Sequence, residues 1–316
     1  MFLGIDIGGT NIKGILLNDE GVIINFIKTL TPITSKDIEI KLLELINNLC
    51  TQKSIRKDKI KAIGIGAAGS IEKKKGIVIT CPNIKSWNRY PLAINIKKKM
   101  GIPVFLENDA TVAILGESWK GHGSKFKNWI MLTLGTGIGG GAVINNKLYT
   151  GQGGNSMEFG HTSINYRGKK CKCGNKGCLE IYASATAVVR FTKTLIKRYP
   201  SSSINKRTEN KKLTSRIVYE EAIKGDELSN KVFKRVSFYL GVGIANFVNI
   251  LNPEAVILGG GLSRAHKLII PGTKIVVKDR ALPGLKENIK FLITKDEEKI
   301  PSIGAAKIAM DSFNKI

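Results

Sequence analysis

Short hydrophobic runs alternate with polar turn residues at the start of the chain. Residues 2–7, 12–17 and 22–27 are rich in Ile, Leu, Val and Phe, and the turn sequences GGTN and NDEG separate them. Such runs, bounded by glycine, asparagine and aspartate, are typical of strands joined by tight turns. The pattern therefore predicts three consecutive antiparallel strands.

The rest of the chain mixes helical and strand-like periods. Apolar residues at helical spacing run from residue 38 to residue 49, with Ser35 as the expected N-cap. Further strands are expected at residues 61–69, 77–80, 102–109, 255–261 and 291–294. Further helices are expected at residues 92–100, 110–119, 186–198, 214–224, 227–251 and 304–313. This mixed order predicts an α/β protein.

The opening pattern returns about 125 residues later. Residues 128–151 again give a strand, a glycine-rich turn, a strand and an Asn-Asn turn, which predicts two related halves. We expect a small lobe of residues 1–116, to which a C-terminal helix at 300–316 returns, and a large lobe of residues 117–299. A cleft between two lobes is the natural place for a site.

Length and composition bound the class of protein. A chain of 316 residues suits about two domains, and an apolar fraction of 42% is typical of a soluble globular protein. The N-terminal residues lack the pattern of a secretion signal, and no apolar run approaches the about 18 residues of a membrane span. We therefore expect a cytoplasmic protein whose thiols stay reduced.

The charge is strongly basic, with 50 Lys and Arg residues against 25 Asp and Glu and a net charge of +25. The lysines are spread along the whole chain, and their short runs contain no interleaved aromatic residues that would stack on bases. We therefore expect a solvated surface and no nucleic-acid partner, with a functional surface for polyanions as the alternative.

Three glycine loops follow apolar strands, at residues 8–10, 135–141 and 259–261. GTGIGG at 135–140 matches a dinucleotide fingerprint only formally, because a strand pattern follows it in place of a helix. Backbone amides at glycine turns can approach phosphate oxygens closely. Asp6, at a strand end before the first loop, can hold hydrated Mg²⁺ beside phosphates.

Three of the five cysteines lie within eight residues, at Cys171, Cys173 and Cys178. With His161 upstream they form a Cys₃His set, which is a common closed, tetrahedral, structural zinc site. Disulfide pairing is the alternative, but a reducing compartment and an odd number of local thiols argue against it. The other two cysteines are expected to be ordinary core or loop residues, Cys50 and Cys81.

Asp109 lies at the carboxyl end of a predicted strand, which is the preferred ligand position in α/β sheets. It also directly precedes a predicted helix, so the residues alone favour an N-cap. Phosphoryl transfer to an alcohol, in contrast, needs a group that positions the attacking hydroxyl and accepts its proton.

Several segments, in order along the chain, carry a family resemblance: GIDIGGTNIKG, LENDATVA, LTLGTGIGGGAVINNKLYTG, MEFGH and CKCGNKGCLE. From Gly4 to the closing SIGAAKIA the chain resembles the ROK family of sugar kinases and sugar-responsive repressors. ASATA after Tyr182 is similar to the bacterial glucokinases of that family. The resemblance implies a two-lobed, actin-like and ribonuclease-H-like α/β fold, with ATP and sugar bound in the cleft between the lobes.

The resemblance also implies roles for individual residues. Asp109 would be the general base, and His161 would share its two ring nitrogens between zinc and a sugar hydroxyl. The sugar would be contacted by Gly69, Asn83, Asn108, Asp109, Glu158, His161 and Glu180. ATP and Mg²⁺ would be bound by Asp6, Gly8, Gly9, Thr10, Asn11, Lys13, Thr133, Gly135, Thr136, Gly137, Gly259, Gly260 and Gly261.

The resulting prediction is an ATP- and Mg²⁺-dependent hexose kinase, with glucose as the first choice of substrate and a homodimer or homotetramer as the expected assembly. N-acetylmannosamine kinase, N-acetylglucosamine kinase and fructokinase share nearly all of these motifs. Family repressors carry a helix-turn-helix domain ahead of the kinase-like body, and the position of Asp6 near the start of this chain argues against one. An inactive sugar-binding module is disfavoured because Asp6, Asp109 and all three glycine loops are intact.

Overall fold

The computed structural model describes residues 1–81, 84, 86–152 and 156–315, which form two compact units. Unit 1 combines residues 1–125 with 294–316, and unit 2 consists of residues 126–293. The expected boundary between residues 116 and 117 would divide helix α3 (Asp109–Lys120), whereas the whole of this helix belongs to unit 1. Helix α10 (Ile300–Phe313) also belongs to unit 1.

Unit 1 is built on a five-stranded sheet in the order β3-β2-β1-β4-β8. Its strands are β1 (Phe2–Ile7), β2 (Asn11–Leu17), β3 (Ile23–Leu30), β4 (Ala62–Ala67) and β8 (Val104–Asn108). The first three strands pair antiparallel, as the sequence pattern predicts, and β4 and β8 run parallel to β1. A smaller sheet contains β5 (Ser70–Glu72), β6 (Ile77–Thr80) and β7 (Asn88–Tyr90).

Helices α1 (Ser35–Thr51) and α2 (Leu92–Met100) complete unit 1 together with α3 and α10. The N-cap of α1 is Thr34, whose side chain accepts a hydrogen bond from the Asp37 N–H, so the prediction of Ser35 is wrong by one residue. Serine and threonine both cap well, and the apolar period alone does not fix a terminal residue.

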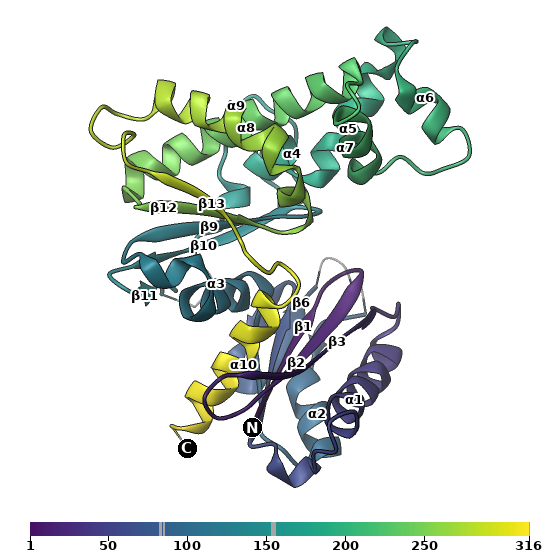
Figure 1. Ribbon diagram of the computed structural model, residues 1–316, viewed down its shortest axis with the longest axis vertical. Helices are drawn as coiled ribbons and strands as arrows, with labels where there is room; N and C mark the ends of the chain where they lie inside the picture. The colour runs from purple at the N-terminus through teal and green to yellow at the C-terminus, as the bar shows by residue number, and fades with distance from the viewer. Residues whose placement is uncertain (82–83, 85, 153–155, 316) are drawn as a thin grey trace. The chain divides into compact units, whose positions relative to one another are not determined.

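Glycines let α10 pack with its backbone against its neighbours in unit 1 (Figure 1). A Cβ added at Gly64 of β4 would lie 1.8 Å from the Ala305 carbonyl oxygen, and one at Gly116 of α3 would lie 2.0 Å from the Ile300 oxygen. Real side chains do not tolerate such distances, because packed interiors have no room to shift backbone. The close approach of α10 to β4 and α3 therefore depends on glycine.

Unit 2 repeats the sheet of unit 1, in the order β11-β10-β9-β12-β13. Its strands are β9 (Trp129–Leu134), β10 (Ile138–Ile144), β11 (Lys147–Leu148), β12 (Ala255–Gly259) and β13 (Lys290–Ile293). The first three again pair antiparallel and the last two run parallel to β9, which confirms the predicted repeat. Asn145 and Asn146, with φ of 51° and 62°, form the predicted Asn-Asn turn.

The helices of unit 2 are α4 (Leu179–Ala183), α5 (Ala185–Leu195), α6 (Ser203–Thr208), α7 (Ser215–Ala222), α8 (Glu227–Leu251) and α9 (His266–Arg280). Helices α8 and α9 pack side by side (Figure 1). The sequence pattern does not predict α9, because Pro271 and the following Gly272 interrupt a helical reading. Within the described residues, none of the helices is both long enough and apolar enough to span a membrane.

Candidate functional site

The first glycine loop is the turn between β1 and β2. The Gly8 N–H donates to the Asn11 carbonyl oxygen at 3.0 Å, and the Thr31 hydroxyl donates to the Gly8 oxygen at 2.7 Å. Gly9 and Thr10 at the tip are exposed. The base of the loop is therefore fixed by hydrogen bonds, while its tip is open to a ligand.

Asp6 and Lys13 face each other across β1 and β2, directly before and after this turn. Asp6 is buried, with 6% of its surface exposed, and the Lys13 ammonium lies 3.5 Å from its carboxylate. Burial raises the pKa of the Asp6 carboxyl from 3.8 to about 6; Lys13 opposes this rise and the charge of Asp109 adds to it. A buried carboxylate at the end of a strand beside a glycine turn is suited to hold a hydrated cation.

Because its pKa is raised, the ionised Asp6 carboxylate lowers the free energy of unfolding at neutral pH. The folded state binds the proton more tightly than the unfolded state does. The contribution of Asp6 to stability is therefore fully present below about pH 4 and is lost as the pH rises through about 6. Asp6→Asn cannot ionise, and we expect it to raise the free energy of unfolding of the ligand-free protein by about 1–3 kcal/mol at pH 7.5. Urea denaturation at pH 4 should show little of this gain; an equal gain at both pH values would contradict the pKa.

Gly69, Asn108 and Asp109 come together where β8 meets α3. The Asn108 side chain is the N-cap of α3, since its oxygen accepts from the N–H groups of Ala110 and Thr111. Its amide nitrogen donates to the Gly69 carbonyl oxygen at 3.0 Å. The capping function belongs to Asn108, and Asp109 is the first residue of the helix, half-buried and close enough to Asp6 to raise its pKa.

In unit 2 the second glycine loop is a hairpin turn between β9 and β10, closed by the Gly135 N–H, which donates to the Gly137 oxygen at 3.0 Å. The strand that follows it confirms that this is no dinucleotide fingerprint. The third loop, at the end of β12, lies beside it because Gly259 pairs with Thr133. Gly260 has a φ of 80°, and a Cβ there would lie 2.7 Å from the Leu134 oxygen. The sheet therefore brings the second and third loops to one edge.

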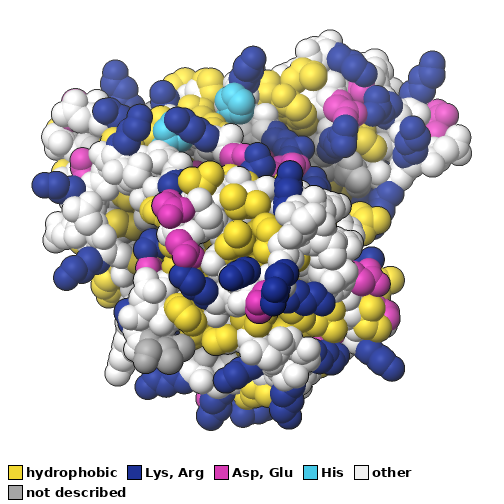
Figure 2. Space-filling model, turned by 60° about the horizontal axis from the view of Figure 1, so that its bottom comes forward, with side chains coloured by type: hydrophobic (Ala, Val, Ile, Leu, Met, Phe, Trp, Pro, Cys, Tyr) yellow, Lys and Arg dark blue, Asp and Glu magenta, His cyan; other side chains and the backbone are white. Residues whose placement is uncertain are grey.

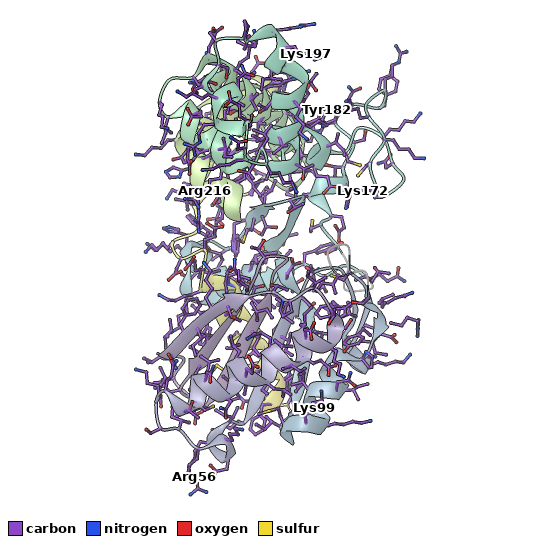
Figure 3. All side chains as sticks on the ribbon, turned by 90° about the vertical axis from the view of Figure 1, so that its right-hand side faces the viewer. Arg56, Lys99, Lys172, Tyr182, Lys197 and Arg216 are labelled. Carbon is purple, nitrogen blue, oxygen red and sulfur yellow. The ribbon has the colours of Figure 1, made fainter. Side chains whose placement is uncertain are left out.

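The predicted metal ligands gather in the loop before α4. The ligand atoms of His161, Cys171, Cys173 and Cys178 all lie within 4.8 Å of one another. The positive φ angles of Gly174 and Gly177 allow the tight path of the loop between the ligands. Figure 3 labels Lys172 in this loop and Tyr182 in α4, whose hydroxyl accepts the Lys169 N–H at 3.0 Å and so anchors the loop.

The donor set fits zinc better than a disulfide. The Cys173 and Cys178 sulfurs are 3.7 Å apart, and the His161 Nδ1 atom is 3.9 Å from the Cys171 sulfur. Two thiolates on one tetrahedral zinc are about 3.8 Å apart, given Zn–S bonds of about 2.3 Å, whereas a disulfide bond is about 2.05 Å long. The sulfurs of Cys171, Cys173 and Cys178 are free thiols. Since Nδ1 faces the thiols, Nε2 remains for a hydroxyl partner.

Besides His161, one of the residues expected to contact the sugar touches this cluster with its side chain, namely Glu180. A Glu180 carboxylate oxygen lies 3.3 Å from the Cys171 sulfur and 3.9 Å from His161 Nδ1. Glu158 is exposed and joins the cluster only through its backbone oxygen, which accepts the His161 N–H at 2.9 Å. Asn83 lies outside the described residues.

Two further residues contact the hairpin, and the sequence does not predict these contacts. The Ala185 N–H donates to the Gly135 oxygen at 2.9 Å, and the Thr186 hydroxyl donates to the Thr136 oxygen at 2.7 Å. The only signal in the sequence is that ASATA resembles glucokinases, which does not reveal what these residues contact.

Basic side chains are spread over the face of the molecule in Figure 2, in keeping with a solvated surface.

The chain is similar in sequence to a known protein family and to individual members of it. The model of the ROK family matches residues 2–312. The chain is 35% identical over 309 residues to a glucokinase of Thermotoga maritima, covering 97% of this chain and 96% of that protein. It is 34% identical over 316 residues to a xylose repressor of Caldicellulosiruptor bescii, covering 98% of this chain and 78% of that protein.

The fold also matches a solved structure, the ROK family glucokinase of Streptomyces griseus in complex with glucose and AMPPNP. The TM-score is 0.85 and the identity 31%, over 98% of this chain and 99% of that chain. This similarity confirms the predicted actin-like α/β fold.

Proposed function

Because the chain belongs to the ROK family, we propose that it is an ATP- and Mg²⁺-dependent hexose kinase that converts glucose and ATP to glucose 6-phosphate and ADP. The observation that carries this proposal is the similarity, over nearly the whole chain, to a glucokinase whose structure contains glucose and AMPPNP. The glycine loops and the acidic residues of unit 1 supply the side chains and amides that such a reaction needs.

Asp109 is the proposed general base. The oxygen of the sugar 6-hydroxyl attacks the γ-phosphorus, its proton passes to the Asp109 carboxylate, and the bond from the γ-phosphorus to the bridging oxygen breaks, so that ADP leaves. Asn108 is the N-cap of α3, and the Asp109 carboxylate also accepts the Ala110 N–H at 2.9 Å. Bound near Asp6, Mg²⁺ would neutralise charge on the β- and γ-phosphate oxygens.

In unit 2 the proposed sugar contacts are Glu158, His161 and Glu180. Zinc would hold His161 by Nδ1, leaving its Nε2–H to donate to a sugar hydroxyl. Glu180 touches the same cluster, so the metal would keep two hydroxyl-binding groups in fixed positions.

We expect glucose to give the highest kcat/KM in a coupled ADP-release assay over glucose, mannose, fructose, N-acetylglucosamine and N-acetylmannosamine. The discrimination rests on single hydroxyl or acetamido groups, which a site of hydrogen-bonding side chains can distinguish strongly. A clear preference for an N-acetylated sugar or for fructose would reject glucokinase in favour of another kinase of the family.

The xylose repressor relatives favour a second candidate, a sugar-responsive regulator. The same assay separates the two functions when direct sugar binding is measured beside it. Sugar binding without ADP release from any sugar of the panel, in the presence of ATP and Mg²⁺, would reject the kinase and support the regulator.

A further inference from the structure

The first residues of α5 donate hydrogen bonds to the glycine hairpin of unit 2. Two carbonyl oxygens of the turn bond to α5: the Gly135 oxygen accepts from the Ala185 N–H at 2.9 Å, and the Thr136 oxygen accepts from the Thr186 hydroxyl at 2.7 Å. The Ser184 side chain caps α5 by accepting the Ala187 N–H. The donors are thus carried by a well-formed helix end.

These two contacts fix the orientation of two peptide planes. In a trans peptide the carbonyl and the following N–H point in opposite directions, and no peptide bond in the described residues is cis. With the Gly135 and Thr136 carbonyls bonded to α5, the N–H groups of Thr136 and Gly137 are turned away from α5. Two neighbouring N–H groups with fixed direction are a ready site for phosphate oxygens.

Glu180 contacts the hairpin at Ile138, directly after the turn. Its second carboxylate oxygen lies 3.4 Å from the Ile138 nitrogen, and a Cβ at Gly137 would come within 2.3 Å of that oxygen. A side chain at position 137 would therefore require the Glu180 carboxylate to move. The first oxygen of Glu180 contacts Cys171, so the cysteine cluster and the hairpin share one side chain.

We propose that Thr186 is a positioning residue for the nucleotide: through its bond to the Thr136 carbonyl it orients the hairpin N–H groups toward the phosphates. This inference rests on the proposed function, in which the hairpin binds ATP. Preorganised donors need no rearrangement when the ligand arrives, which favours binding. Since Thr186 and Thr136 are exposed, water can partly replace the lost bond, and the effect should be moderate.

The test compares Thr186→Val with two matched variants. Thr186→Ser keeps the hydroxyl, and Thr194→Val makes the same change on the same helix, where the Thr194 hydroxyl donates to the Arg190 oxygen and not to the hairpin. Calorimetry measures the Kd for AMPPNP with Mg²⁺ and, separately, for glucose. We expect Thr186→Val to weaken AMPPNP binding about threefold to tenfold, with glucose binding changed less than about twofold. Thr186→Ser and Thr194→Val should match the parent.

The outcomes separate this inference from the proposed function. If the parent binds AMPPNP and Thr186→Val binds it as tightly as Thr194→Val does, Thr186 has no positioning role, although the kinase assignment stands. Equal weakening of glucose and nucleotide in Thr186→Val would also overturn the inference, because it would indicate general damage to unit 2. A parent that binds no nucleotide would overturn both.

Discussion

Asp109→Asn should lower kcat about 10²- to 10⁴-fold, because asparagine keeps the size and polarity of the side chain but cannot accept a proton at neutral pH. Folding should change little, since the Asn108 side chain caps α3 and the substitution leaves that cap intact. The KM for sugar should also change little. Steady-state kinetics with saturating ATP, together with a melting curve, measure all three quantities.

The matched control is Asp37→Asn, the same change at another acidic residue in the first turn of a helix of unit 1. Asp37 is exposed and bonded to Thr34, so its replacement should leave kcat unchanged. If Asp109→Asn stays within a few-fold of the parent, Asp109 is only a first-turn residue of α3, and another group must accept the proton.

Cys173→Ala should release zinc and lower kcat/KM for the sugar by at least about 10- to 100-fold, which is the usual cost of losing even a group that supports a metal ligand. The Cys173 side chain is exposed, so little packing is lost with it. The damage should come instead from loosening the loop that carries His161 and leads into Glu180. Nucleotide affinity should fall less, because α5 holds the hairpin by its own contacts.

Elemental analysis should find close to one zinc per parent chain and a clear loss in Cys173→Ala. Cys50→Ala is the control, because Cys50 is a buried thiol of α1 in unit 1 and belongs to no such cluster among the residues that the structure describes. The shared role of His161 would be wrong if the parent were fully active without metal. It would also be wrong if Cys173→Ala lost zinc and kept a normal KM for sugar.

The sequence predicts those features that short stretches determine. Short apolar runs bounded by turn residues predict the antiparallel strands of both sheets, and the spacing of Cys171, Cys173 and Cys178 predicts a cluster that the loop does form. Helix α9 is not predicted because Pro271 interrupts the helical pattern, although the helix forms and packs against α8.

Local patterns of this kind do not predict contacts between segments that are distant in the sequence. The bonds from the Thr186 hydroxyl to the Thr136 oxygen and from the Ile138 N–H to the Glu180 carboxylate join residues that are 50 and 42 positions apart. Which residue of the Asn108 and Asp109 pair is the N-cap and which is the first residue of the helix depends on backbone angles, which the two neighbouring residue types do not reveal.

The place of α10 in unit 1 has a consequence during translation. Unit 2 is one uninterrupted segment, whereas β4 and α3 of unit 1 are made before it and α10 after it. At roughly 5–20 residues per second, the roughly 170 residues of unit 2 take about 10–30 s to synthesise. For that time the surface around Gly64 and Gly116 lacks the helix that covers it. Unit 2, although synthesised later than most of unit 1, can therefore be the first to complete its fold.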